Sequence, residues 1–90
     1  MSYTFEAVIK NKLGIHARIA ALLVKTVNKY DAEAYIVFHG DKVNVKHLID
    51  VISLSITQNS VVEINIYGTE AAQCSEESQQ LIENSFGEMP

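Results

Sequence analysis

The apolar residues of this chain change their spacing several times within ninety residues, and this pattern sets which folds the chain can adopt. Residues 3–9 alternate, with Tyr3, Phe5 and Ala7 on one face, which is typical of a half-buried strand. From residue 17 to about residue 29, the apolar residues fall instead at the spacing of an amphipathic helix. A chain that changes between these two periods combines strands with helices.

The rest of the chain continues this pattern. Strand formers at residues 34–38 and 42–45, with the turn signal His39-Gly40-Asp41 between them, predict a hairpin. We then expect a short helix at residues 47–54, a strand at residues 61–67 and, after a cap at Thr69, a helix to about Phe86. The resulting order is β-α-β-β-α-β-α.

Short strands joined by one hairpin and two helical crossovers favour an antiparallel or mixed sheet with helices on one face. The other face would meet solvent, which explains the polar strand residues Thr4, Glu6, Glu63 and Asn65. Ninety residues with an apolar fraction of 48% suit a single core, so we predict one domain over residues 1–90.

Charge and cysteine content exclude several classes of protein. The net charge is -4, and seven basic residues are too few for a nucleic-acid binder. One cysteine, Cys74, allows neither an internal disulfide nor a cysteine-based zinc site, and we expect it in the core. No signal-like N-terminal segment and no apolar stretch of membrane-spanning length occur, so we expect a cytoplasmic protein without membrane insertion.

The stretch Leu13-Gly14-Ile15-His16-Ala17-Arg18 joins the first strand to the first helix and carries the candidate chemistry. A helix start has unpaired backbone N–H groups and partial positive charge, so it attracts anions and phosphate above all. Neutral imidazole is a competent nucleophile near pH 7, and Arg18 could pair with the oxygens of a phosphoryl group on His16. Spacing alone also fits an ordinary capping or surface histidine beside a solvated arginine.

This stretch resembles the active-site pattern of the HPr family, the histidine-containing phosphocarriers of the bacterial phosphoenolpyruvate-dependent sugar phosphotransferase system. Residues 14–18 match the family's Gly, aliphatic residue, phosphorylated His, small residue and Arg. Residues 40–46, followed by residues 51–54, resemble the family's hairpin and second helix at the same spacing. The resemblance covers nearly the whole chain.

The resemblance implies an α+β fold, an open-faced β-sandwich of the order βαββαβα, with four antiparallel strands and three helices on one face. It implies that His16 takes phosphate from phosphorylated Enzyme I and passes it to sugar-specific phosphotransferase components. Arg18 and the backbone N–H groups of Ala17 and Ile19 would hold the phosphoryl oxygens.

By the same resemblance, partners and possible regulatory proteins would dock on the surface that joins the first two helices. In this chain that surface would include Ala20, Leu23, Val24, His47, Ile49 and Ile52. The alternative for these apolar residues is a place in the core, which is favoured for Leu23 and Val24.

Three residues depart from the family pattern. Ile19 replaces the usual Pro in the first helical turn, which frees an N–H donor without breaking the helix, so we expect altered phosphate geometry or transfer rate. His47 stands where Gram-positive members carry a serine phosphorylated by a regulatory kinase, so we predict that this switch is absent. Asp50 adds negative charge beside the docking face and would weaken contact with an acidic partner.

Functions from three classes remain open. The first is a phosphocarrier. The second is a regulatory adaptor that binds a transcription factor or an enzyme through Ile49 and Ile52, with phosphorylation vestigial, and Ile19 and His47 favour it. The third is a small enzyme such as a phosphatase, but no acid or base that would position water is evident beside His16.

The remaining polar residues give weaker signals. We expect no metal or other cofactor, because His16, His39 and His47 have no recognisable metal-ligand spacing. His39 is expected to be a solvated turn residue. The pair Glu76-Glu77 is expected to lie on a solvated face.

Overall fold

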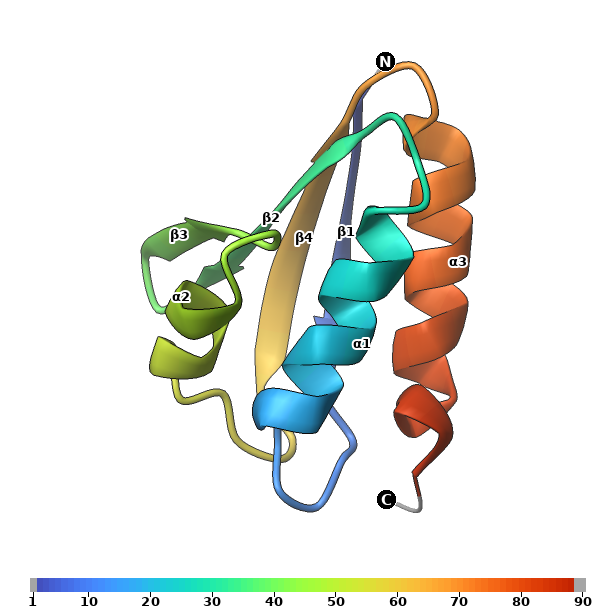
Figure 1. Cartoon of the computed structure of the whole chain (residues 1–90). Helices are drawn as coiled ribbons and strands as arrows, with labels where there is room; N and C mark the ends of the chain where they lie inside the picture. Colours follow the sequence, from blue (N-terminus) through green and yellow to red (C-terminus); the bar gives the residue numbers. More distant parts are fainter. Residues whose placement is uncertain (1, 89–90) are drawn as a thin grey trace.

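The computed structural model describes residues 2–88, so residues 1, 89 and 90 of the expected domain lie outside the described part. The elements are β1 (Ser2–Val8), α1 (Ala17–Val27), β2 (Glu33–Phe38), β3 (Asp41–Asn44), α2 (Leu48–Ser53), β4 (Val61–Tyr67), α3 (Ala71–Glu83) and a short 3-10 turn, η1 (Ser85–Gly87). Three helices and a four-stranded antiparallel sheet confirm the predicted α+β fold and its order (Figure 1).

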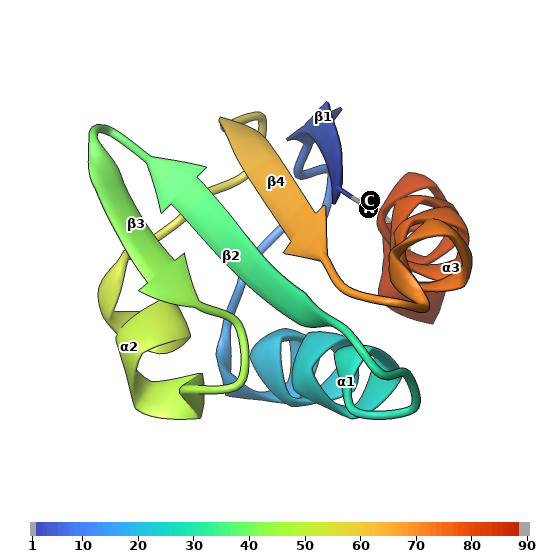
Figure 2. The ribbon, with the colours of Figure 1, turned by 90° about the horizontal axis from the view of Figure 1, so that it is seen from above.

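The strands form one antiparallel sheet in the order β1-β4-β2-β3. β4 pairs with β1 on one side and β2 on the other, so that Ile64 lies opposite both Phe5 and Ile36. β2 and β3 form the predicted hairpin. Seen from above, the three helices lie on the same side of the sheet, and the other face is open (Figure 2). Among the described helices, none is long and apolar enough to cross a membrane.

The last helix differs from the prediction at both ends. The predicted cap at Thr69 is wrong, because the Thr69 hydroxyl donates to Asp31 Oδ2 at 2.6 Å and the helix begins after Glu70. The helix also ends before Phe86, because Ser85 and Phe86 have φ values of 53° and 54°. A left-handed backbone cannot continue a right-handed helix, so the chain changes direction at η1.

The covered face of the sheet carries the hydrophobic core. Its buried side chains come from the strands and from all three helices, and they include Ile36, Ile64, Ile66, Ile19, Leu23, Val27, Val51, Cys74 and Ile82. Each large apolar side chain removed from water contributes roughly 1.5–3 kcal/mol, which makes this core the main source of stability. Cys74 lies in it as predicted, and burial raises the pKa of its thiol.

The open face of the sheet is less solvated than predicted. The polar residues expected there on β1 are exposed, but Asn65 on β4 is only 6% exposed. Tyr35 lies directly opposite Asn65, and its ring centroid is 6.0 Å from that of Tyr67. The Lys42 ammonium lies 5.1 Å from the Tyr35 ring and 5.7 Å from the Tyr67 ring. These larger side chains shield Asn65 from water.

A polar cluster joins the end of α1 to α3. Glu77 accepts hydrogen bonds from the Lys29 ammonium and from the Tyr30 hydroxyl, both at 2.5 Å. Glu77 is therefore not the freely solvated residue that the sequence predicts. The bonds from Lys29 and then Tyr30 lower the pKa of Glu77, and the bond to Glu77 raises the pKa of Tyr30 to about 12.

This cluster predicts loss of stability at both ends of the pH range. Above pH 10, unfolded Tyr30 ionises while folded Tyr30 resists ionisation up to about pH 12, so its contribution declines as the pH rises through that window. Glu77 has a lowered folded pKa, so its contribution is present above the usual value of 4.5 and declines as the pH falls. Urea unfolding across this range, compared with Tyr30→Phe and Glu77→Gln, measures both effects. Parallel pH profiles for parent and variants would contradict the assignment.

Candidate functional site

His16 occupies the position just before α1. Its backbone is extended (φ -90°, ψ -179°), and its side chain makes no capping hydrogen bond. The capping role left open by the sequence is therefore wrong. The imidazole is 30% exposed, so it is partly accessible from solution.

The first turn of α1 presents backbone donors next to His16 that have no acceptor among residues 2–88. The Ala20 amide donates to the His16 carbonyl at 2.9 Å and closes the first helical hydrogen bond. The amides of Ala17, Arg18 and Ile19 come before it and have no intrahelical acceptor. The sequence predicted the Ala17 and Ile19 amides as phosphate donors, and they lie in this first turn. The Ile19 side chain is fully buried and fixes the turn to the core.

The loop that leads to His16 is fixed by a close backbone approach. Gly14 has a φ of +67°, and the next amide, that of Ile15, donates to the Ile56 carbonyl at 2.9 Å. A Cβ on Gly14 would lie 2.0 Å from that carbonyl oxygen. Glycine is therefore required here both for its backbone conformation and for space.

We expect Gly14→Ala to lower the free energy of unfolding by about 2 kcal/mol or more, because it combines a left-handed alanine with a clash. Gly40→Ala is the matched control, since Gly40 has a φ of +84° but nothing within 4 Å of an added Cβ. The control should lose only about 1 kcal/mol. Urea denaturation of both variants measures the difference, and equal losses would show that the contact with Ile56 is unimportant.

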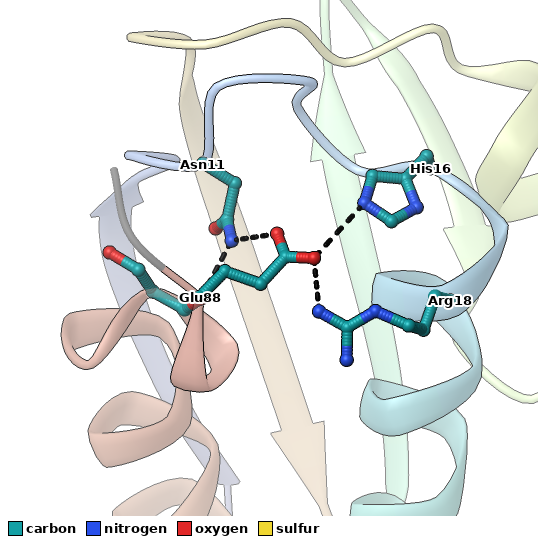
Figure 3. Close-up of polar contacts among 5 residues, drawn as sticks. Asn11, His16, Arg18 and Glu88 are labelled. Atoms are coloured by element: carbon teal, nitrogen blue, oxygen red, sulfur yellow. Dashed lines mark hydrogen bonds and ion pairs between the residues drawn. The ribbon is translucent and has the colours of Figure 1, made fainter.

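A carboxylate from the end of the chain lies beside His16 and Arg18 (Figure 3). Glu88 Oε2 accepts a hydrogen bond from the Arg18 guanidinium and lies 3.5 Å from His16 Nε2. Glu88 Oε1 accepts a hydrogen bond from Asn11 Nδ2 at 2.8 Å. The bonds from Arg18 and then Asn11 lower the pKa of Glu88, so this carboxylate is ionised at neutral pH.

Sequence reasoning missed Asn11 and Glu88. Asn11 was assigned only to the break after the first strand, yet it is fully buried. Glu88 lies 70 positions from Arg18, and it reaches the site only because η1 turns the chain after α3. No local pattern in the sequence indicates such a contact.

The predicted docking surface needs correction on α1. Ala20 is 0% exposed and Leu23 is 1% exposed, because both face the core, so neither is available to a partner. For Leu23 this confirms the place in the core that the sequence favoured over docking. Val24 is half-buried.

The docking residues predicted on α2 are accessible to different extents. Ile49 is 71% exposed, Ile52 is half-buried and His47 is exposed, with its Nδ1 3.4 Å from Asp50 Oδ2. Leu13, which the docking prediction did not include, is 76% exposed. Within residues 2–88, no group of three or more His, Cys, Asp or Glu side chains is arranged to hold a metal ion.

Known proteins resemble the chain over nearly its whole length. Residues 3–84 match the PTS-HPr family model, described as "PTS HPr component phosphorylation site". The chain is 34% identical over 83 residues to the phosphocarrier protein HPr of Xylella fastidiosa (strain 9a5c), which covers 92% of this chain and 93% of that protein.

Two solved structures are similar to this fold. An HPr structure from Thermoanaerobacter tengcongensis has a TM-score of 0.92 and 34% identity, and the match covers 98% of this chain and 99% of that one. The phosphocarrier protein HPr from Bacillus anthracis str. Ames has a TM-score of 0.84 and 28% identity, with 90% and 96% covered. Because the family match spans both the fold and the motif around His16, the chain belongs to the HPr family of phosphocarrier proteins.

Proposed function

We propose that this chain carries a phosphoryl group on His16, which it accepts from phosphorylated Enzyme I and passes to sugar-specific phosphotransferase components. The observation that best supports this is that His16 and Arg18 approach the same carboxylate oxygen at the start of α1. Arg18 thus holds an anionic oxygen next to the imidazole, and it would hold a phosphoryl oxygen by the same kind of charge-assisted hydrogen bond. The amides of Ala17 and Ile19 offer donors for further phosphoryl oxygens.

We assign the nucleophilic attack to Nδ1 of His16. Nε2 faces Glu88, and a carboxylate there favours the imidazole tautomer with its proton on Nε2 (Figure 3). Nδ1 then keeps its lone pair. In the transfer, this lone pair forms the bond to phosphorus while the bond from phosphorus to the donor breaks, and the electron pair of that bond stays with the donor. Transfer to an acceptor reverses these changes.

The proposed docking surface consists of Leu13, Val24, His47, Ile49 and Ile52. Leu13 and Ile49 are the most exposed of its apolar members. A partner that covers them would remove this apolar surface from water. Asp50, close to His47, adds negative charge that would disfavour an acidic partner surface.

The proposal places the chain in the cytoplasm, with protein partners, no nucleic-acid partner and no cofactor of its own. His47 in place of the regulatory serine cannot form a phosphoserine, so the absence of that switch stays a prediction. Ile19 in place of proline leaves an additional N–H group in the first turn. We expect this donor to change the rate of transfer and not to abolish it.

The direct test is incubation of the protein with Enzyme I and labelled phosphoenolpyruvate. We expect label that is lost in mild acid, as a phosphoramidate should be, and no label on His16→Ala. Arg18→Ala should be labelled roughly ten- to a hundredfold more slowly, because a charge-assisted hydrogen bond to the phosphoryl group is lost. Lys25→Ala removes an exposed positive charge elsewhere on α1 and is the matched control. An unlabelled parent protein, under conditions that charge an ordinary HPr, would refute the carrier proposal.

A regulatory adaptor is the second candidate function, and the 71% exposure of Ile49 favours it together with the departures at Ile19 and His47. In that case the protein would bind a regulatory partner through α2 and would not be labelled. Labelling followed by transfer to a sugar-specific component would exclude this as the main role.

We expect Ile49→Asp to raise the KM for the protein in Enzyme I-dependent labelling by about tenfold, because it places a charge in the proposed docking surface. Its free energy of unfolding should change by less than about 0.5 kcal/mol, since the side chain is exposed. Val8→Asp, at an exposed apolar residue on β1, is the control and should leave the KM unchanged. An unchanged KM for Ile49→Asp would remove α2 from the surface that meets Enzyme I.

A further inference from the structure

The Glu88 carboxylate is already hydrogen-bonded to Arg18, the side chain that a phosphoryl group on His16 would need. Arg18 is the guanidinium of the proposed site, and its hydrogen bond goes to Glu88 Oε2. The same oxygen lies 3.5 Å from His16 Nε2. In the described structure, Arg18 is therefore engaged by an anion from the protein itself.

A left-handed turn after α3 brings Glu88 to this place. Ser85, Phe86 and Gly87 have φ values of 53°, 54° and 79°, so three successive residues take the left-handed conformation. Two of these residues are not glycine, which makes the turn unfavourable by itself. Phe86 is 4% exposed, and the Glu88 amide donates to the Ser85 carbonyl at 2.9 Å. Burial of Phe86 and this hydrogen bond hold the turn.

Asn11 connects this turn to the loop that precedes His16. Its Nδ2 donates to the Ser85 carbonyl at 2.6 Å and to Glu88 Oε1 at 2.8 Å. Its Oδ1 is buried and has no hydrogen-bond partner within the described residues. Burying an amide oxygen in this way is unfavourable, so Asn11 contributes through its donor group. That group fixes both the turn and the carboxylate.

We propose that Glu88 is a placeholder partner for Arg18: its carboxylate holds the guanidinium beside His16 in the uncharged protein and yields it to the phosphoryl oxygens when His16 is charged. This inference rests on the proposed role of His16. A phosphoryl group brings nearly two negative charges, so it repels the carboxylate and attracts the guanidinium. The Glu88 side chain can move away by rotation, while Asn11 keeps its bond to Ser85.

The exchange has a consequence for the carrier. Forming the phosphorylated state breaks the ion pair between Arg18 and Glu88, so the phosphoryl group is held less tightly than it would be by a free arginine. Glu88 therefore favours passing the group on. Arg18 is also kept in position between transfers instead of moving freely in solvent.

Titration of the isotope-labelled protein with inorganic phosphate tests this without any enzymatic step. The Arg18 side-chain N–H signal and the amide signals of residues 17–19 would be followed by NMR at constant ionic strength. We expect Glu88→Gln to bind phosphate roughly two- to fivefold more tightly than the parent, which is the range for loss of an exposed ion pair. Glu83→Gln removes the same charge at an exposed position on α3 and is the control for long-range effects.

Two further variants make the result decisive. In an Arg18→Ala background, Glu88→Gln should no longer increase phosphate affinity, because the competition is for Arg18. Unchanged amide signals for residues 85–87 would show that Glu88→Gln keeps the turn. Equal phosphate affinity for Glu88→Gln and Glu83→Gln, or the same gain without Arg18, would overturn the placeholder role. Failure of the Enzyme I labelling would instead refute the carrier function, whatever the phosphate titration gives.

Discussion

The hydrogen bond from the Ile15 amide to the Ile56 carbonyl fixes where the first helix begins, and the candidate site depends on it. Gly14 allows the two backbones to meet, and the side chains of Ile15 and Ile19 are both buried. His16 thus stands between two anchored residues. Its backbone is held while its imidazole stays partly exposed, which is the combination that a reactive side chain on a protein surface needs.

The site brings together three distant parts of the chain: residue 11, residues 16–18 and residue 88. α3 makes this possible because the chain is attached to the rest of the molecule at the middle of this helix and again just after its end. Glu77 binds Lys29 and Tyr30 after α1, and the Ser85 carbonyl accepts the bond from Asn11. The core fixes the face of the sheet on which α3 lies. The polar bonds fix where α3 ends, and so they fix the place of Glu88.

The spacing of the apolar residues predicted the order of the elements and the placement of the helices on one face of the sheet. It could do so because each strand or helix carries its own apolar spacing. The motif around His16 predicted the start of α1 and its free amides for a similar reason, since they depend on neighbouring residues.

Properties set by distant contacts were not predictable. The shielding of Asn65 depends on Tyr35 from the neighbouring strand β2 and on Tyr67 at the end of β4. The contact between Arg18 and Glu88 depends on the left-handed turn at Ser85 and Phe86. Ala20 was assigned to a docking surface by resemblance, but it is buried because of the orientation of α1 against the sheet. The burial of Leu23 agrees with the place in the core that its sequence position favoured.

The burial of Cys74 has a practical consequence. Its thiol is 0% exposed beneath α3 and, because burial raises its pKa, reacts poorly while the helix is in place. An alkylating reagent in solution would therefore modify only those molecules in which α3 has briefly separated from the sheet. Since this is the single cysteine of the chain, the rate of its modification would report how often α3 separates from the sheet, without any added probe.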